Sequence, residues 1–195
     1  MSSGPIGIFG GTFDPVHKGH ESIAASFLGS GQIDELWVML TPLPPHKLES
    51  EHVAYDHRLK MLKLVFGNQD RIRISTIEKT LPKPSYTYQT IRELKKRFPD
   101  NRYLFCMGED SLEKFHTWKF YERILEECKL LVAQRPGADH HLVKPEIISK
   151  TIFVDHEPLD ISSTEVKNKL KQGSDCRDQL NPDVLNYIEN EGLYT

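Results

Sequence analysis

Two histidines, His17 and His20, stand three residues apart at the end of the run "GIFGGTFDPVHKGH". The run follows a short apolar segment and precedes residues with helical spacing, so its glycines fall at a predicted strand-to-helix turn. Glycine lets the backbone approach an anion closely, and the new helix offers unpaired N–H groups and the positive end of its dipole. Two imidazole rings at such a turn can stabilise the charge that gathers on a transferring phosphoryl group.

The glycine spacing excludes two common phosphate motifs, because neither GxGxxG nor GxxxxGK[ST] is present. An isolated pair of histidines with this spacing is also typical of an exposed helix surface, or of a metal site completed here by Asp14. The strand and the glycine turn in front of the pair favour the anion site.

A second polar helix start lies near the carboxyl terminus, in "DISSTEVKNKL". Ser162 and Glu165 form a capping-box pattern, which predicts a helix start with or without a ligand. Ser163 and Thr164 add hydroxyl groups beside the exposed N–H groups, and Lys167 adds a positive charge one turn later. We predict that this helix start and the histidine turn converge on the same polyphosphate.

The elements that must position these side chains alternate in the order βαβαβαβ. The strand candidates are "PIGIFG", "ELWVML", "RIRIST", "RYLFCMG", "KLLVAQ" and "TIFVDH", and most of them are near-continuous apolar runs. This order predicts an α/β fold, a doubly wound parallel sheet with right-handed crossovers and ligands outside the carboxyl ends of its strands. Residues 162–172 and 182–191 are predicted to be two closing helices. We expect one domain over residues 1–195, with the helices of about 162–195 packed on the same core.

The composition narrows the class of protein further. A net charge of −3 provides no global basic field, so we expect no nucleic-acid partner. Three cysteines without CxxC spacing argue against a disulfide framework and a thiolate metal site. We find no signal peptide and no apolar run near the about 18 residues that a membrane span needs, so we expect no membrane partner and a cytoplasmic location.

The pairing of "GTFDPVHKGH" with "ISSTEVK" resembles the nucleotidyltransferase superfamily that carries HxGH and ISSTxxR motifs. Further stretches look like the bacterial nicotinate mononucleotide adenylyltransferases, namely "PLPPHK", "SYTYQT", "MGEDS", "HTWK", "AQRPG" and "VLNYIENEGLY". The resemblance implies a Rossmann-like fold and transfer of the AMP part of ATP to nicotinate mononucleotide, which gives nicotinate adenine dinucleotide and pyrophosphate. It also implies Mg²⁺, which we expect to arrive on ATP. Nicotinamide mononucleotide or phosphopantetheine as the acceptor, or a nucleotide-sensing module without catalysis, are the alternatives.

The resemblance also assigns roles by position. It implies that His17 and His20 are catalytic and contact the ATP phosphates. The other ATP-binding residues that it implies are Gly10, Gly11, Thr12, Phe13, Gly108, Asp110, Arg135, Ile161, Ser162, Ser163, Thr164 and Lys167. Those implied for nicotinate mononucleotide are Asp14, Lys47, Thr87, Trp118 and Lys119. No protein ligand to a metal is expected.

One position departs from the family pattern, because the ISST motif most often ends in arginine and here ends in Lys167. Lysine keeps the charge but lacks the flat bidentate fork of a guanidinium group. We therefore expect a weaker or differently aimed phosphate contact at this position. ATP and nicotinate mononucleotide are the expected small-molecule partners, and the sequence leaves open whether the chain also forms a homo-oligomer.

Overall fold

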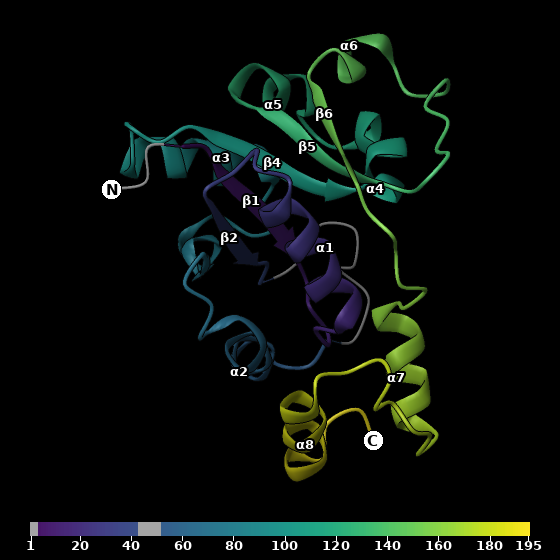
Figure 1. The fold of residues 1–195 in the computed structure, drawn as a ribbon. Coiled ribbons are helices and arrows are strands. Elements are labelled where there is room, and N and C mark those ends of the chain that lie inside the picture. The colour runs from purple at the N-terminus through teal and green to yellow at the C-terminus, as the bar shows by residue number, and fades with distance from the viewer. Residues whose placement is uncertain (1–3, 43–51) are drawn as a thin grey trace.

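A computed structural model describes residues 4–42 and 52–195 of the chain (Figure 1). Six parallel strands form one sheet in the order β3-β2-β1-β4-β5-β6. The strands are β1 (Ile6–Gly11), β2 (Glu35–Leu40), β3 (Ile72–Ser75), β4 (Tyr103–Gly108), β5 (Lys129–Gln134) and β6 (Thr151–Asp155). The fold prediction is confirmed: five of the six predicted runs contain a whole strand, and β1 extends one residue beyond the run "PIGIFG".

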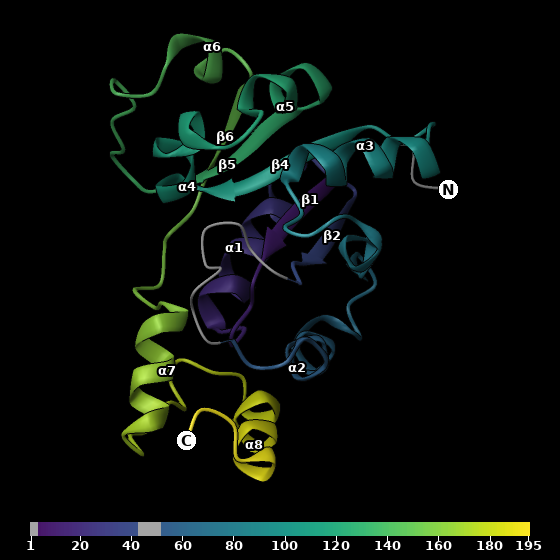
Figure 2. The ribbon, with the colours of Figure 1, turned by 180° about the vertical axis from the view of Figure 1, so that it is seen from behind.

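Helices cover both faces of the sheet, as the two opposite views in Figures 1 and 2 show. The α-helices are α1 (Lys18–Gly29), α2 (Tyr55–Phe66), α3 (Thr87–Arg97), α4 (Glu109–Glu113), α5 (Tyr121–Glu127), α6 (Pro145–Ile148), α7 (Ser163–Lys171) and α8 (Pro182–Glu191). Among the described residues, the 3₁₀-helices η2 (Ile77–Thr80) and η3 (Phe115–Thr117) lie in the connections. Because a strand between two helical layers buries both of its faces, its sequence is continuously apolar rather than alternating.

Successive side chains of the central strands β1 and β2 enter two different cores. Phe9 and Val38 point into a buried cluster shared with α1, α2, α7 and α8, whereas Ile8 and Met39 point into a second cluster shared with α3 and α5. Gly7, between Ile8 and the start of β1, leaves no room for a side chain, since a Cβ atom there would lie 2.7–2.9 Å from three neighbouring side chains. The two cores hold β1 rigidly, and this rigidity fixes the position of the turn that follows it.

The two closing helices differ from their predicted bounds by at most one residue at either end. The side chain of Asn181 accepts a hydrogen bond from the backbone N–H of Asp183 at the start of α8, and Gly192 ends this helix with φ 60°. A left-handed residue at this place is normally glycine, because a Cβ atom would be strained. Helix α8 packs against α2, and both views place the two side by side (Figures 1 and 2).

The buried Arg58 of α2 links the ends of β1 and β2 by hydrogen bonds. Its guanidinium donates hydrogen bonds to the carbonyl oxygens of Thr12 (2.8 Å), Thr41 (3.0 Å), Pro42 (3.1 Å) and Val53 (3.0 Å). The side chain is only 2% exposed, so these carbonyl groups supply the partners that water would otherwise provide. Arg58 therefore fixes the loops at the carboxyl ends of β1 and β2 relative to each other.

Candidate active site

Two cavities open beside the carboxyl end of β1, where the order of the strands reverses between β1 and β4. Open parallel sheets bind ligands at this point because the loops of the two halves diverge there. One cavity, of about 600 Å³, is lined by His17 and His20, and we call it the histidine cavity. The other, of about 390 Å³, is lined by Trp118, and we call it the tryptophan cavity. Gly10 lines both cavities, so they adjoin at the end of β1.

The turn after β1 stacks the two histidine rings against each other, with their centroids 3.8 Å apart and their planes inclined by 37°. His17 is the N-cap of α1, and its backbone N–H donates to Nδ1 of His20 at 3.2 Å. A ring nitrogen that accepts a hydrogen bond carries no proton, so the neutral His20 ring has its proton on Nε2. The turn thus fixes the tautomer of His20 as well as its place.

His17 is 6% exposed, and burial lowers the pKa of its ring from 6.5 to about 4. The ring is therefore neutral at physiological pH and can act as a hydrogen-bonding group but not as a cation. Its Nδ1 atom is buried and has no hydrogen-bond partner among residues 4–42 and 52–195. This atom faces the first turn of α1, near the backbone of Gly19 and His20, and the ring as a whole lines the histidine cavity.

The start of α7 forms the opposite wall of the histidine cavity. Ile161, Ser162 and Glu165 line it, and the hydroxyl of Ser162 accepts a hydrogen bond from the backbone N–H of Glu165 at 3.2 Å. The capping function of Ser162 predicted from the sequence is confirmed by this contact. The structure therefore brings the histidine turn and the late helix start to one cavity, as the convergence of the two motifs requires.

The carboxyl ends of β4 and β5 complete the histidine cavity with Gly108, Asp110 and Arg135. The guanidinium of Arg135 donates to both oxygens of Asp110, at 3.1 and 3.2 Å, on an exposed rim. Sequence reasoning missed His156, which follows β6, is 8% exposed and lies 2.9 Å from the Ser26 hydroxyl through Nδ1. Burial, and next the charge of Arg135, lower the pKa of His156. No spacing in the sequence relates His156 to His17 and His20, because only the folding of the sheet brings the end of β6 to the histidine cavity.

Several residues predicted at the site line neither cavity. The hydroxyl of Ser163 donates to the carbonyl oxygen of Pro15 at 3.1 Å, and the ammonium of Lys167 donates to Oδ2 of Asp14 at 3.2 Å. Thr164 is exposed on α7. Phe13 and Asp14 are both 2% exposed and belong to the support of the turn. Lys47 lies outside the described residues.

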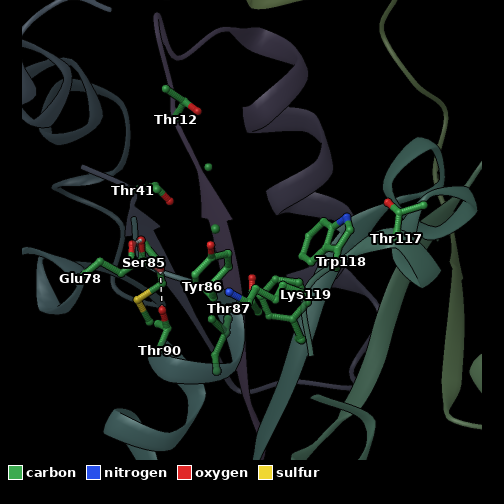
Figure 3. Close-up of a pocket in the computed structure, with 15 residues that line it drawn as sticks. Thr12, Thr41, Glu78, Ser85, Tyr86, Thr87, Thr90, Thr117, Trp118 and Lys119 are labelled. Carbon is green, nitrogen blue, oxygen red and sulfur yellow. Dashed lines mark hydrogen bonds between the residues drawn. The ribbon is translucent and has the colours of Figure 1, made fainter. Parts of the chain in front are cut away.

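The tryptophan cavity gathers the predicted residues Gly11, Thr12, Thr87, Trp118 and Lys119. Figure 3 shows Trp118 on one side of the cavity and Ser85 on the other, with Thr87 between them. The first turn of α3 begins at Thr87, and the first N–H groups of a helix have no partner within it. Gly11 and Thr12, which the resemblance assigns to ATP, thus lie on this side of the shared boundary.

Trp118 combines a packing role with a place at the cavity. Its ring packs on Phe105 and Phe115, with centroids 5.9 and 5.4 Å apart. The Nζ atom of Lys119 lies 4.7 Å from the ring centroid of Tyr86, within the range of a cation–π contact. Both the expected binding role and the plainer core role of Trp118 are therefore compatible with its position.

The sequence gives no signal for Glu78, a buried carboxylate that lines the tryptophan cavity. Its side chain accepts hydrogen bonds from the hydroxyls of Ser85 (3.2 Å) and Thr90 (2.8 Å), which lie on either side of the start of α3 (Figure 3). Burial raises the pKa of Glu78, and hydrogen bonds from Thr90, Thr41 and Ser85 oppose the rise. One carboxylate thereby joins β2, η2 and α3 around the cavity, although in the sequence it looks like a solvated surface charge.

No group of three or more histidine, cysteine, aspartate or glutamate side chains in residues 4–42 and 52–195 could hold a metal ion. Over the same residues, no helix has the length and apolar character that crossing a membrane would require.

Comparison with known proteins agrees with this geometry. Residues 8–169 match the cytidylyltransferase-like family. The nicotinate-nucleotide adenylyltransferase of Bacillus subtilis is 35% identical over 190 residues, which cover 97% of each chain. A probable nicotinate-nucleotide adenylyltransferase of Flavobacterium johnsoniae is 34% identical over 189 residues, covering 97% of this chain and 98% of that one. The chain belongs to the nicotinate-nucleotide adenylyltransferase family.

Membership of this family extends to the three-dimensional fold. The nicotinic acid mononucleotide adenylyltransferase of Plasmodium falciparum, solved in complex with NaAD, superimposes with a TM-score of 0.80. The superposition covers 98% of this chain and 97% of that one at 21% sequence identity. The likeness in fold therefore extends over nearly the full length of the chain.

Proposed function

We propose that this chain transfers the adenylyl group of ATP to nicotinate mononucleotide, forming nicotinate adenine dinucleotide and pyrophosphate for NAD synthesis. The observation that carries the proposal is the pair of cavities that adjoin at Gly10, one lined by two histidines and a helix start, the other by an aromatic ring and the first turn of α3. ATP occupies the histidine cavity and the mononucleotide occupies the tryptophan cavity. The full-length relatives of 34–35% identity support this assignment.

In this reaction the substrate supplies its own nucleophile. A phosphate oxygen of the mononucleotide attacks the α-phosphorus of ATP, a new P–O bond forms, and the bond from the α-phosphorus to the bridging oxygen breaks as pyrophosphate leaves with its electron pair. No serine or cysteine nucleophile is needed. The protein must hold two polyanions in line, and positioning of this kind supplies roughly 7–11 kcal/mol of the barrier in favourable cases.

The histidine turn provides hydrogen-bond donors rather than a cation at His17. The ring of His17 is neutral because it is buried, and His20 carries its proton on Nε2 when neutral, as the contact to the backbone of His17 requires. Preorganised donors of this kind are worth about 3–4 kcal/mol each when they meet charge that develops in the transition state. We assign both rings to the phosphates of ATP, with the exposed N–H groups at the start of α7 on the other side.

The tryptophan cavity suits a flat ring that carries a carboxylate. The indole of Trp118 offers an aromatic face, and the first N–H groups of α3, from Thr87 onward, offer donors and the positive end of a helix dipole. The Lys119 ammonium lies at the same wall. We therefore assign these three residues to the pyridine end of the mononucleotide.

We propose that Mg²⁺ reaches the site bound to ATP. Acidic residues such as Asp110 line the histidine cavity, but among the described residues no three possible ligands gather into a cage, and Mg²⁺ commonly keeps several waters and binds through substrate phosphates. When bound, the ion neutralises charge on the departing pyrophosphate. We also propose that residues 1–195 act as one domain, because Val166 and Val184 share a buried cluster with Phe27 of α1.

The test is pyrophosphate release by the purified chain with ATP, Mg²⁺ and one acceptor at a time. Nicotinate mononucleotide should give the highest kcat/KM, ahead of nicotinamide mononucleotide and of phosphopantetheine. A preference for either of the other acceptors would refute the substrate assignment. Tight binding of ATP in calorimetry without turnover of any acceptor would refute catalysis and favour a nucleotide sensor.

A further inference from the structure

The carboxyl-terminal part of the chain forms hydrogen bonds with the histidine turn on both sides of His17. Before His17, the Ser163 hydroxyl donates to the carbonyl oxygen of Pro15 at 3.1 Å. After it, the backbone N–H of Lys18 donates to the carbonyl oxygen of Gln179 at 2.9 Å. Both contacts join residues that are far apart in the sequence, so the turn depends on the end of the chain for its shape.

Asp14, within the histidine turn, makes further contacts with the carboxyl-terminal part of the chain. Its Oδ1 accepts a hydrogen bond from the hydroxyl of Tyr194 at 2.7 Å, and its Oδ2 lies 2.9 Å from Nδ1 of His52 and 3.2 Å from the ammonium of Lys167. Burial alone would raise the pKa of Asp14, but these three partners outweigh it and hold the pKa below its ordinary value. The charge of the buried Arg58 also faces this carboxylate. Both oxygens are therefore committed to protein groups.

Tyr194, the last residue but one, is well suited to a fixed contact. Its side chain is 8% exposed and belongs to the same buried cluster as Phe13 and Val16 of the turn. Burial, and next the charge of Asp14, raise the pKa of the phenol, so the hydroxyl keeps the proton that it donates. Neither Tyr194 nor Asp14 lines the histidine cavity or the tryptophan cavity, and both residues are buried.

We propose that Tyr194 is a positioning residue for adenylyl transfer: its hydroxyl holds Asp14 and, through the next three residues of the chain, sets the place of the His17 ring. This inference rests on the proposed function. The short path from Asp14 to His17 leaves little freedom to absorb a displacement, and a misplacement of 1 Å in a catalytic group can cost about 100-fold in rate.

The chain offers a matched control for the loss of this one hydroxyl. Tyr187 of α8 also forms a 2.7 Å contact through its hydroxyl, to Nδ1 of His57 on α2, away from the histidine turn. Replacement of either tyrosine by phenylalanine keeps the ring and removes one hydrogen bond. A purely structural role for Tyr194 would leave turnover the same in both variants and show only as a loss of stability, larger in Tyr194→Phe because its hydroxyl donates to a buried carboxylate.

The experiment compares Tyr194→Phe, Tyr187→Phe and the unaltered chain by kcat, by KM for each substrate and by Tm. We expect kcat of Tyr194→Phe to fall by about 10-fold or more, with both KM values within about 3-fold, whereas Tyr187→Phe keeps its kcat. Asp14→Asn should lower kcat as well, and adding Tyr194→Phe to it should lower kcat little further, because the two residues act through one contact. Equal kcat in the two phenylalanine variants, or fully additive losses, would overturn the proposal.

A second measurement reads the turn without any substrate. The ring resonances of His17 and His20 in ¹⁵N-labelled protein should shift in Tyr194→Phe and stay in place in Tyr187→Phe. Unmoved resonances in Tyr194→Phe would overturn the proposal even if its kcat fell. Should the unaltered chain release no pyrophosphate with any acceptor, the proposed function fails, while the ring spectra still decide whether Tyr194 sets the turn.

Discussion

Replacement of His17 by asparagine should flatten the dependence of stability on pH below neutrality. In the unfolded chain the ring takes up a proton near pH 6.5, whereas in the folded protein burial delays protonation to about pH 4. Between these two values the unfolded state binds more protons than the folded state, so acid favours unfolding. The penalty is absent above pH 6.5, grows as the pH falls, and is complete near pH 4.

The size of the effect follows from the difference between the two pKa values. One pH unit corresponds to about 1.4 kcal/mol, so a pKa lowered from 6.5 to about 4 corresponds to about 3 kcal/mol. Because His17 is only 6% exposed, screening by water reduces this free energy little. Asparagine has no titratable ring and should abolish the whole contribution.

Urea unfolding at several pH values between 4 and 8 measures the difference directly. On going from pH 8 to pH 4 the unaltered chain should lose about 3 kcal/mol more free energy of unfolding than His17→Asn, whatever the difference between them at pH 8. His116→Asn, at an exposed ring, provides the control for the substitution itself. Parallel curves for the unaltered chain and His17→Asn would refute the assignment of a buried, neutral ring, and with it the donor role that we give to His17.

Two further predictions concern the supports of the site. Glu78→Gln should raise KM for the mononucleotide by about 10-fold, equivalent to about 1.4 kcal/mol, and leave KM for ATP unchanged. The reason is that the Glu78 carboxylate organises only the tryptophan cavity. Steady-state kinetics with each substrate varied in turn measures both constants, and an equal rise in both would contradict this role. Arg58→Lys should lower the free energy of unfolding by about 3 kcal/mol, because an ammonium cannot serve the four carbonyl groups that the guanidinium now serves; an unchanged urea midpoint would contradict this account.

The fold follows from the sequence because its signal is local. A strand covered by helices on both faces must be apolar along its whole length, and runs such as "ELWVML" show this without knowledge of the neighbours. The histidine turn is also visible, because glycines, histidines and the following helix are contiguous. The sequence therefore allowed the two motifs that meet at the histidine cavity to be predicted.

The supports of the site were not predictable in this way. Lys167 pairs with Asp14 across 153 positions, and no spacing in the sequence indicates this partner. Glu78 lies between charged and polar neighbours and reads as a surface residue, yet hydroxyls from later elements bury and satisfy it. Contacts of this kind arise only when distant segments pack together, so each depends on the complete tertiary structure.

The meeting of the two cavities at Gly10 has a consequence for inhibitor design. A Cβ atom at this residue would find no atom within 4 Å, so the boundary is open space rather than a packed wall. A single compound with a purine at one end and a pyridine acid at the other could cross there, and its second end would meet its pocket at an effective concentration set by the tether instead of the bulk solution. Bridging molecules of modest size can thus gain affinity that neither half has alone.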